Sequence, residues 1–101
     1  MVPVDWAQPA VDDLREIYEF IARDSPRYAQ QTIGKITQAS ARLAHFSQLG
    51  EILPEFPHLA YRQLVVGVYR LIYREDLQHN RILVMGVIHG SRNLPPILEN
   101  R

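Results

Sequence analysis

The stretch that decides the fold lies near the carboxyl end of the chain, where residues 81–89 read RILVMGVIH. Apolar residues occupy both of its alternating sets of positions, so neither side of this strand suits water. The stretch therefore predicts an interior strand of a sheet. Strict alternation predicts two groups of side chains on opposite faces: Leu83, Met85, Val87 and His89 on one, and Ile82, Val84, Gly86 and Ile88 on the other.

Two further strands are predicted immediately before it. Residues 61–66 and 68–74 are rich in β-branched and aromatic side chains, and Gly67 separates them. The polar residues 75–80 are typical of a turn that leads into residues 81–89. Because consecutive strands with short connections pair as neighbours, we expect all three to be antiparallel.

The amino-terminal half predicts one strand and two helices. Residues 2–6 are apolar at alternate positions, which is typical of a strand. Residues 9–23 begin with a proline and repeat apolar residues at helical spacing. Ser25 and Pro26 are a cap and first-turn pair for a second helix, which we expect to end at Gly50. The short link between the helices predicts an antiparallel hairpin.

The order of these elements predicts an α+β fold in a single domain over residues 1–101. It has an N-terminal strand, an antiparallel helix hairpin and then three antiparallel strands, with the helices packed on one face of a small sheet. Pro54 and Pro57 predict an irregular connection over residues 51–58. Since the helices cover only one face, we expect the other apolar face to bind a partner segment or a second copy of the chain.

Composition excludes several classes of protein. The chain has 101 residues, of which 47% are hydrophobic and 22% charged, as expected for one globular core. It has no apolar run near the roughly 20 residues of a membrane helix and no recognisable signal peptide, so we expect a cytoplasmic location. The absence of cysteine excludes disulfides and thiolate chemistry. A formal net charge of zero argues against strong direct nucleic-acid binding.

Few residues carry recognisable chemistry. No phosphate-binding glycine loop, dinucleotide motif or nucleophile elbow is present, and the four histidines are scattered, so we expect no metal and no cofactor. The acidic residues of the first helix are interpreted as a solvated face: Asp12, Asp13, Glu16 and Glu19. A polar cluster remains near the C-terminal strands, and it includes Arg70, Arg74, His89 and Arg92. Arginine and histidine together can stabilise a phosphorane and transfer a proton, as metal-free RNA cleavage requires.

Four segments in a fixed order carry a family resemblance: VDWAQPAVDDLREIYEFIA (4–22), LGEILPEFPHLAYRQL (49–64), VYRLIYRE (68–75) and ILVMGVIHGSRNLPP (82–96). With them, nearly the whole chain resembles toxins of the RelE/ParE superfamily from bacterial type II toxin-antitoxin operons. The resemblance implies the same strand, helix hairpin and three strands. It also implies an antitoxin whose C-terminal segment wraps the toxin, which supplies a partner for the uncovered face.

The superfamily has two functional branches. RelE-like members are ribosome-dependent messenger-RNA endonucleases, and ParE-like members are described as inhibitors of DNA gyrase. Arg70 matches an arginine of the nuclease branch, and Arg92 lies near the position of a second. However, the acid-base group that this branch often adds next is missing from residues 93–98, and the chain lacks the basic charge that ribosomal RNA favours. The ending VIHGSRNLPP (87–96) resembles the ParE branch.

The resemblance therefore implies a ParE-like toxin that binds and poisons DNA gyrase and is neutralised by a cognate antitoxin. On this interpretation we expect target binding by Arg70, Arg74, His89 and Arg92, and antitoxin binding by Leu94, Ile97 and Leu98. Two alternatives remain open. The first is a metal-independent endoribonuclease that uses Arg70, His89 and Arg92, and the second is an inactivated toxin that only binds antitoxin. A toxin dimer and a hetero-oligomer with antitoxin are both compatible with the sequence.

Overall fold

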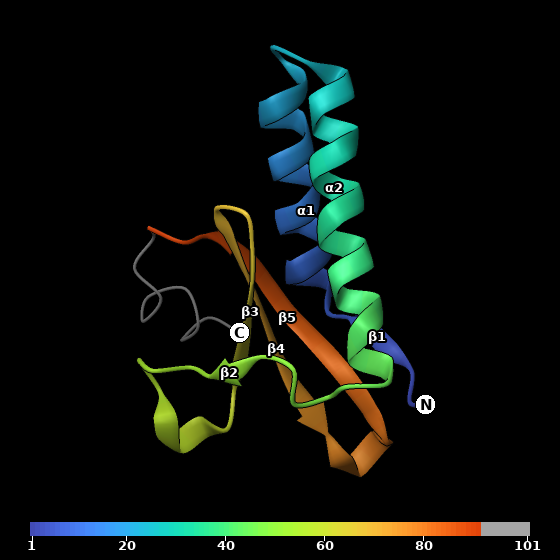
Figure 1. Cartoon of the computed structure of the whole chain (residues 1–101), viewed down its shortest axis with the longest axis vertical. Helices are drawn as coiled ribbons and strands as arrows, with labels where there is room; N and C mark the ends of the chain where they lie inside the picture. Colours follow the sequence, from blue (N-terminus) through green and yellow to red (C-terminus); the bar gives the residue numbers. More distant parts are fainter. Residues whose placement is uncertain (92–101) are drawn as a thin grey trace.

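The computed structural model describes residues 1–91, in which a helix hairpin packs on a five-stranded mixed sheet (Figure 1). In chain order the elements are β1 (Val4–Trp6), α1 (Gln8–Ala22), α2 (Pro26–Ala41), β2 (Glu51–Ile52), β3 (Arg62–Val66), β4 (Tyr69–Asp76) and β5 (Arg81–His89). Short 3₁₀ turns lie at Arg42–Ala44, Pro57–Leu59 and Leu77–His79. The strand order is β1-β5-β4-β3-β2. The predicted succession of a strand, a helix hairpin and antiparallel strands is confirmed.

The helix hairpin forms where the sequence predicts it. Pro9 lies in the first turn of α1, and Ser25 caps α2, since its hydroxyl oxygen accepts a hydrogen bond from the backbone N–H of Tyr28 at 3.1 Å. α1 packs along β5, and α2 reaches β3, so the hairpin covers one face of the sheet (Figure 1). Within residues 1–91, no helix is long and apolar enough to span a membrane.

The prediction that the second helix ends at Gly50 is wrong. α2 ends at Ala41, and Gly50 lies in the connection that follows. The Gly50 N–H donates to the phenol oxygen of Tyr73 at 2.8 Å, and the phenol donates to the carbonyl of Ser47 at 2.9 Å. A Cβ at Gly50 would overlap the backbone carbonyl of Gln63. Glycine is needed here because the connection packs tightly on the sheet, and not because a helix stops.

β1 adds one parallel pair to an otherwise antiparallel sheet. Val4 pairs with Ile82 and Trp6 pairs with Val84, whereas β2, β3, β4 and β5 pair antiparallel in succession. β5 therefore has β1 on one side and β4 on the other, which confirms it as an interior strand. The alternating pattern of the first strand predicted its existence but not its partner, because alternation carries no information on strand direction.

β5 does not keep strict alternation. Ile72 pairs with Gly86, but the next residue of β4, Tyr73, pairs with Val84, so Met85 is an extra residue without a partner on β4. Such a β-bulge inserts one residue and exchanges the two faces of the strand beyond it. The predicted grouping of the side chains of β5 is therefore wrong.

The bulge decides which side chains reach each core. Three residues of β5 join the main core under the helices: Ile82, Val84 and Val87. On the opposite face, Ile88 packs with Leu53 and Ile72, and Phe56 and Tyr61 lie against them. The face that the sequence left uncovered is thus partly covered by the connection between β2 and β3.

That connection also departs from the prediction. The first two residues of the predicted irregular connection 51–58 form β2, which pairs antiparallel with Arg62 and Gln63. Pro54 and Pro57 both come after this pairing, so neither proline removes a hydrogen bond from it. The connection therefore covers residues 53–61, so it begins two residues later and ends three residues later than predicted.

Candidate functional site

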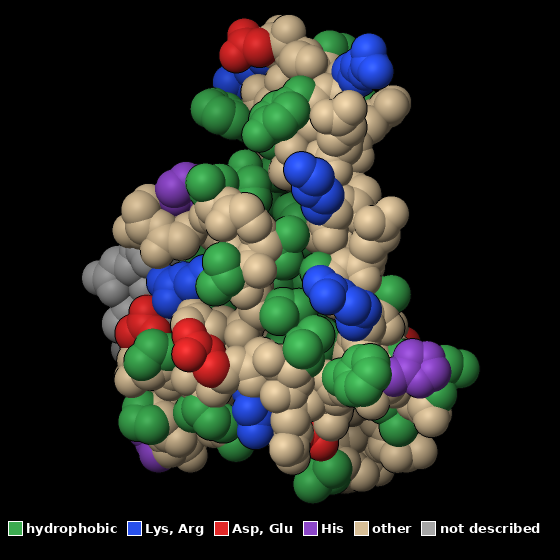
Figure 2. Space-filling model, viewed as in Figure 1, with side chains coloured by type: hydrophobic (Ala, Val, Ile, Leu, Met, Phe, Trp, Pro, Cys, Tyr) green, Lys and Arg blue, Asp and Glu red, His purple; other side chains and the backbone are tan. Residues whose placement is uncertain are grey.

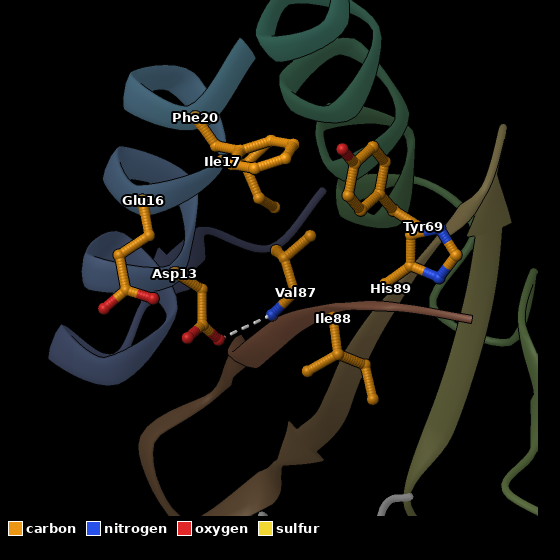
Figure 3. A pocket seen from close by; sticks show the side chains of 8 residues that line it. All are labelled: Asp13, Glu16, Ile17, Phe20, Tyr69, Val87, Ile88 and His89. Atoms are coloured by element: carbon orange, nitrogen blue, oxygen red, sulfur yellow. Dashed lines mark hydrogen bonds between the residues drawn. The ribbon is translucent and has the colours of Figure 1, made fainter. Parts of the chain in front are cut away.

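The first candidate site is a recess of about 370 Å³ between α1 and the ends of β4 and β5, which we call the α1 recess (Figure 3). It is lined by Asp13, Glu16, Ile17 and Phe20 of α1, Tyr69 of β4, and Val87, Ile88 and His89 of β5. Figure 3 shows the two carboxylates at one end, Tyr69 and His89 at the other, and apolar side chains between them. The recess therefore combines an apolar lining with a negatively charged end.

Asp13 belongs to the fold as well as to the recess. Its Oδ2 accepts a hydrogen bond from the backbone N–H of Val87 at 2.9 Å (Figure 3). β1 pairs with β5 only as far as Val84, so the Asp13 carboxylate provides a hydrogen-bond acceptor beyond the end of that pairing. The interpretation of Asp13 as a solvated residue is wrong. The sequence contained a signal that Asp13 faces the sheet, because Ala10 and Ile17 lie one helical turn away on either side and both reach the core.

His89 is exposed at the end of β5, with its ring edge-on to Tyr69 and the ring centroids 5.9 Å apart. Its Nδ1 accepts from the backbone N–H of Ser91 at 3.2 Å and lies 2.8 Å from the Ser91 hydroxyl oxygen. Since a backbone N–H can only donate, Nδ1 is the acceptor in the contact with the Ser91 amide. Burial, followed by the charge of Tyr28, raises the pKa of Tyr69, so its phenol is protonated at neutral pH.

The charges of the α1 recess oppose phosphate binding. Among the described residues, its lining contains Asp13 and Glu16 but no lysine or arginine. Binding of a phosphate or an RNA backbone depends on cationic partners, and nearby carboxylates repel it. The lining of the recess around His89 thus suits a neutral or basic group of a partner better than a nucleic acid.

Arg70 points away from His89. The register pairs Arg70 with Ile88, the residue before His89, so alternation directs Arg70 and His89 to opposite faces of the sheet. The Arg70 Nη1 donates to Glu55 at 2.9 Å and to the side-chain oxygen of Gln63 at 3.1 Å. Only 13% of the Arg70 side chain is exposed. The structure separates two residues that the nuclease alternative combines.

Arg74 belongs to a charged cluster at the turn between β4 and β5. Its Nη1 lies 3.8 Å from Oδ1 of buried Asp76, whose Oδ2 lies 2.8 Å from both Arg81 Nε and His79 Nδ1. Arg81 also reaches Asp5 of β1 at 3.3 Å. The hydrogen bond from Arg81 lowers the pKa of Asp76 against the opposing effect of burial. The cluster therefore joins the turn to β1, in surroundings separate from those of Arg70 and His89.

The other predicted site residues lie outside the described residues: Arg92, Leu94, Ile97 and Leu98. Within residues 1–91, no group of three or more His, Cys, Asp or Glu side chains could hold a metal ion. Sequence reasoning missed Asp76, for which there was no local signal. Its partner Arg81 is near in sequence, but Asp5 joins the cluster only when β1 pairs with β5.

Comparison with known proteins gives matches to one family and to its fold. The sequence model described as "ParE toxin of type II toxin-antitoxin system, parDE" matches residues 4–94. A chain of the chromosomal ParDE toxin-antitoxin system from P. aeruginosa is 18% identical, with a TM-score of 0.70, and the match covers 88% of this chain and 96% of that one. A chain of the toxin-antitoxin complex RelBE2 from Mycobacterium tuberculosis is 22% identical, with a TM-score of 0.63 and coverage of 87% and 96%. No curated protein sequence matches.

Proposed function

Since this chain belongs to the ParE toxin family of type II toxin-antitoxin systems, we propose that it inhibits bacterial growth by binding DNA gyrase and that a cognate antitoxin neutralises it. We place this activity in the cytoplasm, where gyrase and its DNA are found. In this function the chain acts by contact with its target and performs no cleavage. The sequence resemblance to the ParE branch, in which His89 precedes Arg92 and prolines follow it, supports the choice of target.

One observation supports binding over RNA cleavage, namely the position of Arg70 relative to His89. A nuclease without a metal needs a cation and a proton donor or acceptor at one phosphate. Here the two side chains lie on opposite faces of the sheet, and Arg70 is already paired with Glu55. His89 instead lies in a recess whose lining, within residues 1–91, includes the carboxylates of Asp13 and Glu16.

We propose Arg70, Arg74, His89 and Arg92 as the target contacts. His89 is exposed, and 38% of the Arg74 side chain is exposed, so both are accessible to a partner protein. Arg70 is less accessible, and its pairing with Glu55 holds the connection between β2 and β3 against the sheet. We therefore expect Arg70 to contribute by holding the connection between β2 and β3 in place.

An antitoxin partner is part of the same proposal. Both structural relatives described above are chains of toxin-antitoxin systems, which supports a protein partner for this chain. We assign antitoxin binding to Leu94, Ile97 and Leu98, whose apolar side chains follow β5 in the sequence. The resulting assembly would be a hetero-oligomer of toxin and antitoxin.

The test is to express the chain without antitoxin and to follow growth, plasmid supercoiling and transcript integrity in one culture. We expect growth arrest, altered supercoiling or gyrase-dependent DNA breaks, and intact transcripts. His89→Ala and Arg74→Ala should weaken the arrest, whereas Arg15→Ala, which removes an exposed arginine of α1 far from both in sequence, should not. Folding of each variant is checked by its thermal unfolding midpoint.

Other outcomes identify the alternatives. Cleaved messenger RNA that disappears with Arg70→Ala would replace gyrase binding with endonuclease activity. Normal growth together with tight antitoxin binding would identify an inactivated toxin that serves only as an antitoxin-binding module. Full toxicity of folded His89→Ala and Arg74→Ala would remove these two residues from the target contacts.

A further inference from the structure

The α1 recess has room for one long side chain of a partner. Its volume of about 370 Å³ lies at the lower end of the range of roughly 300 to 1,000 Å³ for pockets that hold small ligands. His89, proposed above as a target contact, is part of its lining. A target that covers His89 therefore also meets this recess.

An aromatic ring beside the recess is exposed to solvent. Phe20 is 69% exposed, although a phenylalanine normally buries most of its surface. Ile17 of α1 and Val87 of β5 complete this apolar part of the lining, and Figure 3 shows all three side chains directed into the space between α1 and β5. Exposed apolar groups around one hollow mark a surface where a partner removes them from water.

The acidic end of the recess is ordered by the fold itself. The Asp13 carboxylate accepts a hydrogen bond from the Val87 N–H at 2.9 Å, so the backbone of β5 sets its direction. Glu16 lies about one helical turn further along α1 and is exposed. Because the fold already holds the Asp13 carboxylate, a cation that meets it there costs less in conformational entropy. The charge and the order of this end favour a basic group.

A guanidinium suits these side chains better than an ammonium. Its planar fork pairs with a carboxylate through two parallel hydrogen bonds, and its face stacks on aromatic rings. The chain already contains one such stacking contact, since the Arg23 Cζ lies 5.8 Å from the centroid of the Phe20 ring. The methylene groups of an arginine also pack on apolar side chains such as Ile17 and Val87. An arginine therefore matches both the apolar lining and the acidic end.

The other flank of the helix hairpin has the opposite charge. Two adjoining recesses of about 570 Å³ and 140 Å³ lie between α2 and the hairpin of β3 and β4, and we call their union the α2 groove. Lys35 and Arg42 line it, and no acidic residue within residues 1–91 does. Figure 2 shows basic side chains spaced along α2. A basic segment of a partner is therefore attracted to the α1 flank and repelled from the α2 flank.

We propose that the α1 recess receives an arginine side chain that the target presents beside an apolar residue. The guanidinium meets Asp13 and Glu16, the methylene groups lie along the apolar lining, and the neighbouring apolar residue covers Phe20. This inference rests on the proposed function, because it specifies the chemistry of the target surface that His89 contacts.

The first test measures the affinity of the purified chain for DNA gyrase by calorimetry. Glu16→Lys reverses a charge in the recess, and its matched control, Glu19→Lys, makes the same change at an exposed residue of α1 outside the lining. We expect Glu16→Lys to bind gyrase about tenfold more weakly than the control. Phe20→Ala should also bind more weakly than Phe46→Ala, which removes a similarly exposed ring outside the recess. Thermal unfolding midpoints verify that all four variants fold.

The second test identifies the chemistry of the occupant without gyrase. N-acetylarginine amide and its neutral isostere, N-acetylcitrulline amide, are titrated into the whole chain, and NMR follows the backbone amides of Ile17 and Val87. We expect saturable shifts at millimolar concentrations of the arginine compound, and about tenfold weaker binding of the citrulline compound, because only the guanidinium is charged. Glu16→Lys should remove these shifts.

The opposite results separate this inference from the proposed function. Equal gyrase affinities of Glu16→Lys and Glu19→Lys, or equal shifts from the two compounds, would overturn the inference while leaving gyrase binding intact. Tighter gyrase binding by Glu16→Lys would show that the target presents an acidic group, which also overturns it. Weaker binding of Glu16→Lys to antitoxin but not to gyrase would assign the recess to the antitoxin and refute the target assignment. Failure of the wild-type chain to bind gyrase would instead overturn the proposed function.

Discussion

The two flanks of the helix hairpin differ in charge and in how the sheet edge is closed. The α1 recess contains Asp13 and Glu16, whereas the α2 groove contains Lys35 and Arg42. At the α1 flank, a side chain of the fold itself accepts the hydrogen bond of the Val87 N–H. At the α2 flank, the outer edge of β3 beyond β2 has no strand partner in the described chain.

This difference shows why overall charge is a poor guide to partners in a small domain. The formal net charge is zero, yet acidic and basic groups gather on separate flanks. Because exposed charges interact mainly within a Debye length of about 8 Å, a partner responds to the flank that it touches more than to the total. Three substitutions test how the two flanks are held and how they differ, and a fourth tests the charged cluster outside them.

The largest effect is expected from Gly50→Ala, which disturbs the sheet under both flanks. The added Cβ overlaps the Gln63 carbonyl and crowds the Tyr73 ring, so the connection must shift and its hydrogen bonds to Tyr73 weaken. We expect a loss of about 3 kcal/mol in the free energy of unfolding, measured in urea. Gly34→Ala is the control, because a Cβ at this helical position would meet no atom of residues 1–91 within 4 Å beyond its chain neighbours and the adjacent helix backbone, and it should stabilise the chain by about 0.5 to 1 kcal/mol. A harmless Gly50→Ala would contradict the close packing of the connection on the sheet.

Asp13→Ala should remove the hydrogen bond between α1 and β5 at the α1 flank and leave the other flank unchanged. It leaves the Val87 N–H without its acceptor at the edge of the sheet, at a cost of about 1 to 2 kcal/mol in unfolding free energy. Asp13→Asn retains an acceptor oxygen and should lose less. Hydrogen exchange at the Val87 amide separates this local effect from global unfolding, since that amide should exchange faster in the alanine variant. Equal stability of the alanine variant and the wild-type chain would show that the bond to Val87 is dispensable.

The charged cluster between β4 and β5 lies outside both flanks and predicts a dependence on pH. The pKa of Asp76 is lowered in the folded chain, first by the hydrogen bond from Arg81, so folding favours the ionised form. Its contribution to stability is therefore complete above the ordinary pKa of 3.8 and is lost as the pH falls through the lowered value. Asp76→Asn should flatten this acid limb in urea unfolding measured across the acidic range. An unchanged acid limb would indicate that other carboxylates dominate it.

The smallest effect is expected from Glu16→Gln in the α1 recess. Unlike Asp13, Glu16 has no hydrogen bond or ion pair recorded within residues 1–91, so removal of its charge should change the unfolding free energy by less than about 0.5 kcal/mol. The same unfolding assay measures it. A loss as large as that of Asp13→Ala would show that both carboxylates support the fold, and the contrast between them would disappear.

The sequence predicted the elements of the fold but only part of the candidate site. Ser25 and Pro26 marked the start of α2 through local capping, and the apolar residues 81–89 marked an interior strand through burial on both sides. These signals lie within one segment. The face of each side chain of β5 could not be predicted, because the bulge at Met85 depends on how β5 pairs with β4.

The same limit applies to the predicted site residues. Arg70 and His89 were grouped by residue type, but the register of β4 and β5 separates them onto opposite faces. Asp13 was grouped with its acidic neighbours, although its spacing from Ala10 and Ile17 already indicated the inner side of α1. Residue type identified candidates, whereas register and helix facing decided which of them share a surface.

By itself, the sequence determined the order of strands and helices, the helix hairpin, the absence of thiol chemistry and the neutral total charge. Each of these follows from composition or from contacts between residues close in the chain. Only the tertiary structure decided the parallel pairing of β1, the second core beneath the connection between β2 and β3, and the division of charge between the α1 recess and the α2 groove. The physical reason is that these features arise from pairing and packing between segments distant in the chain, about which local periodicity carries no information.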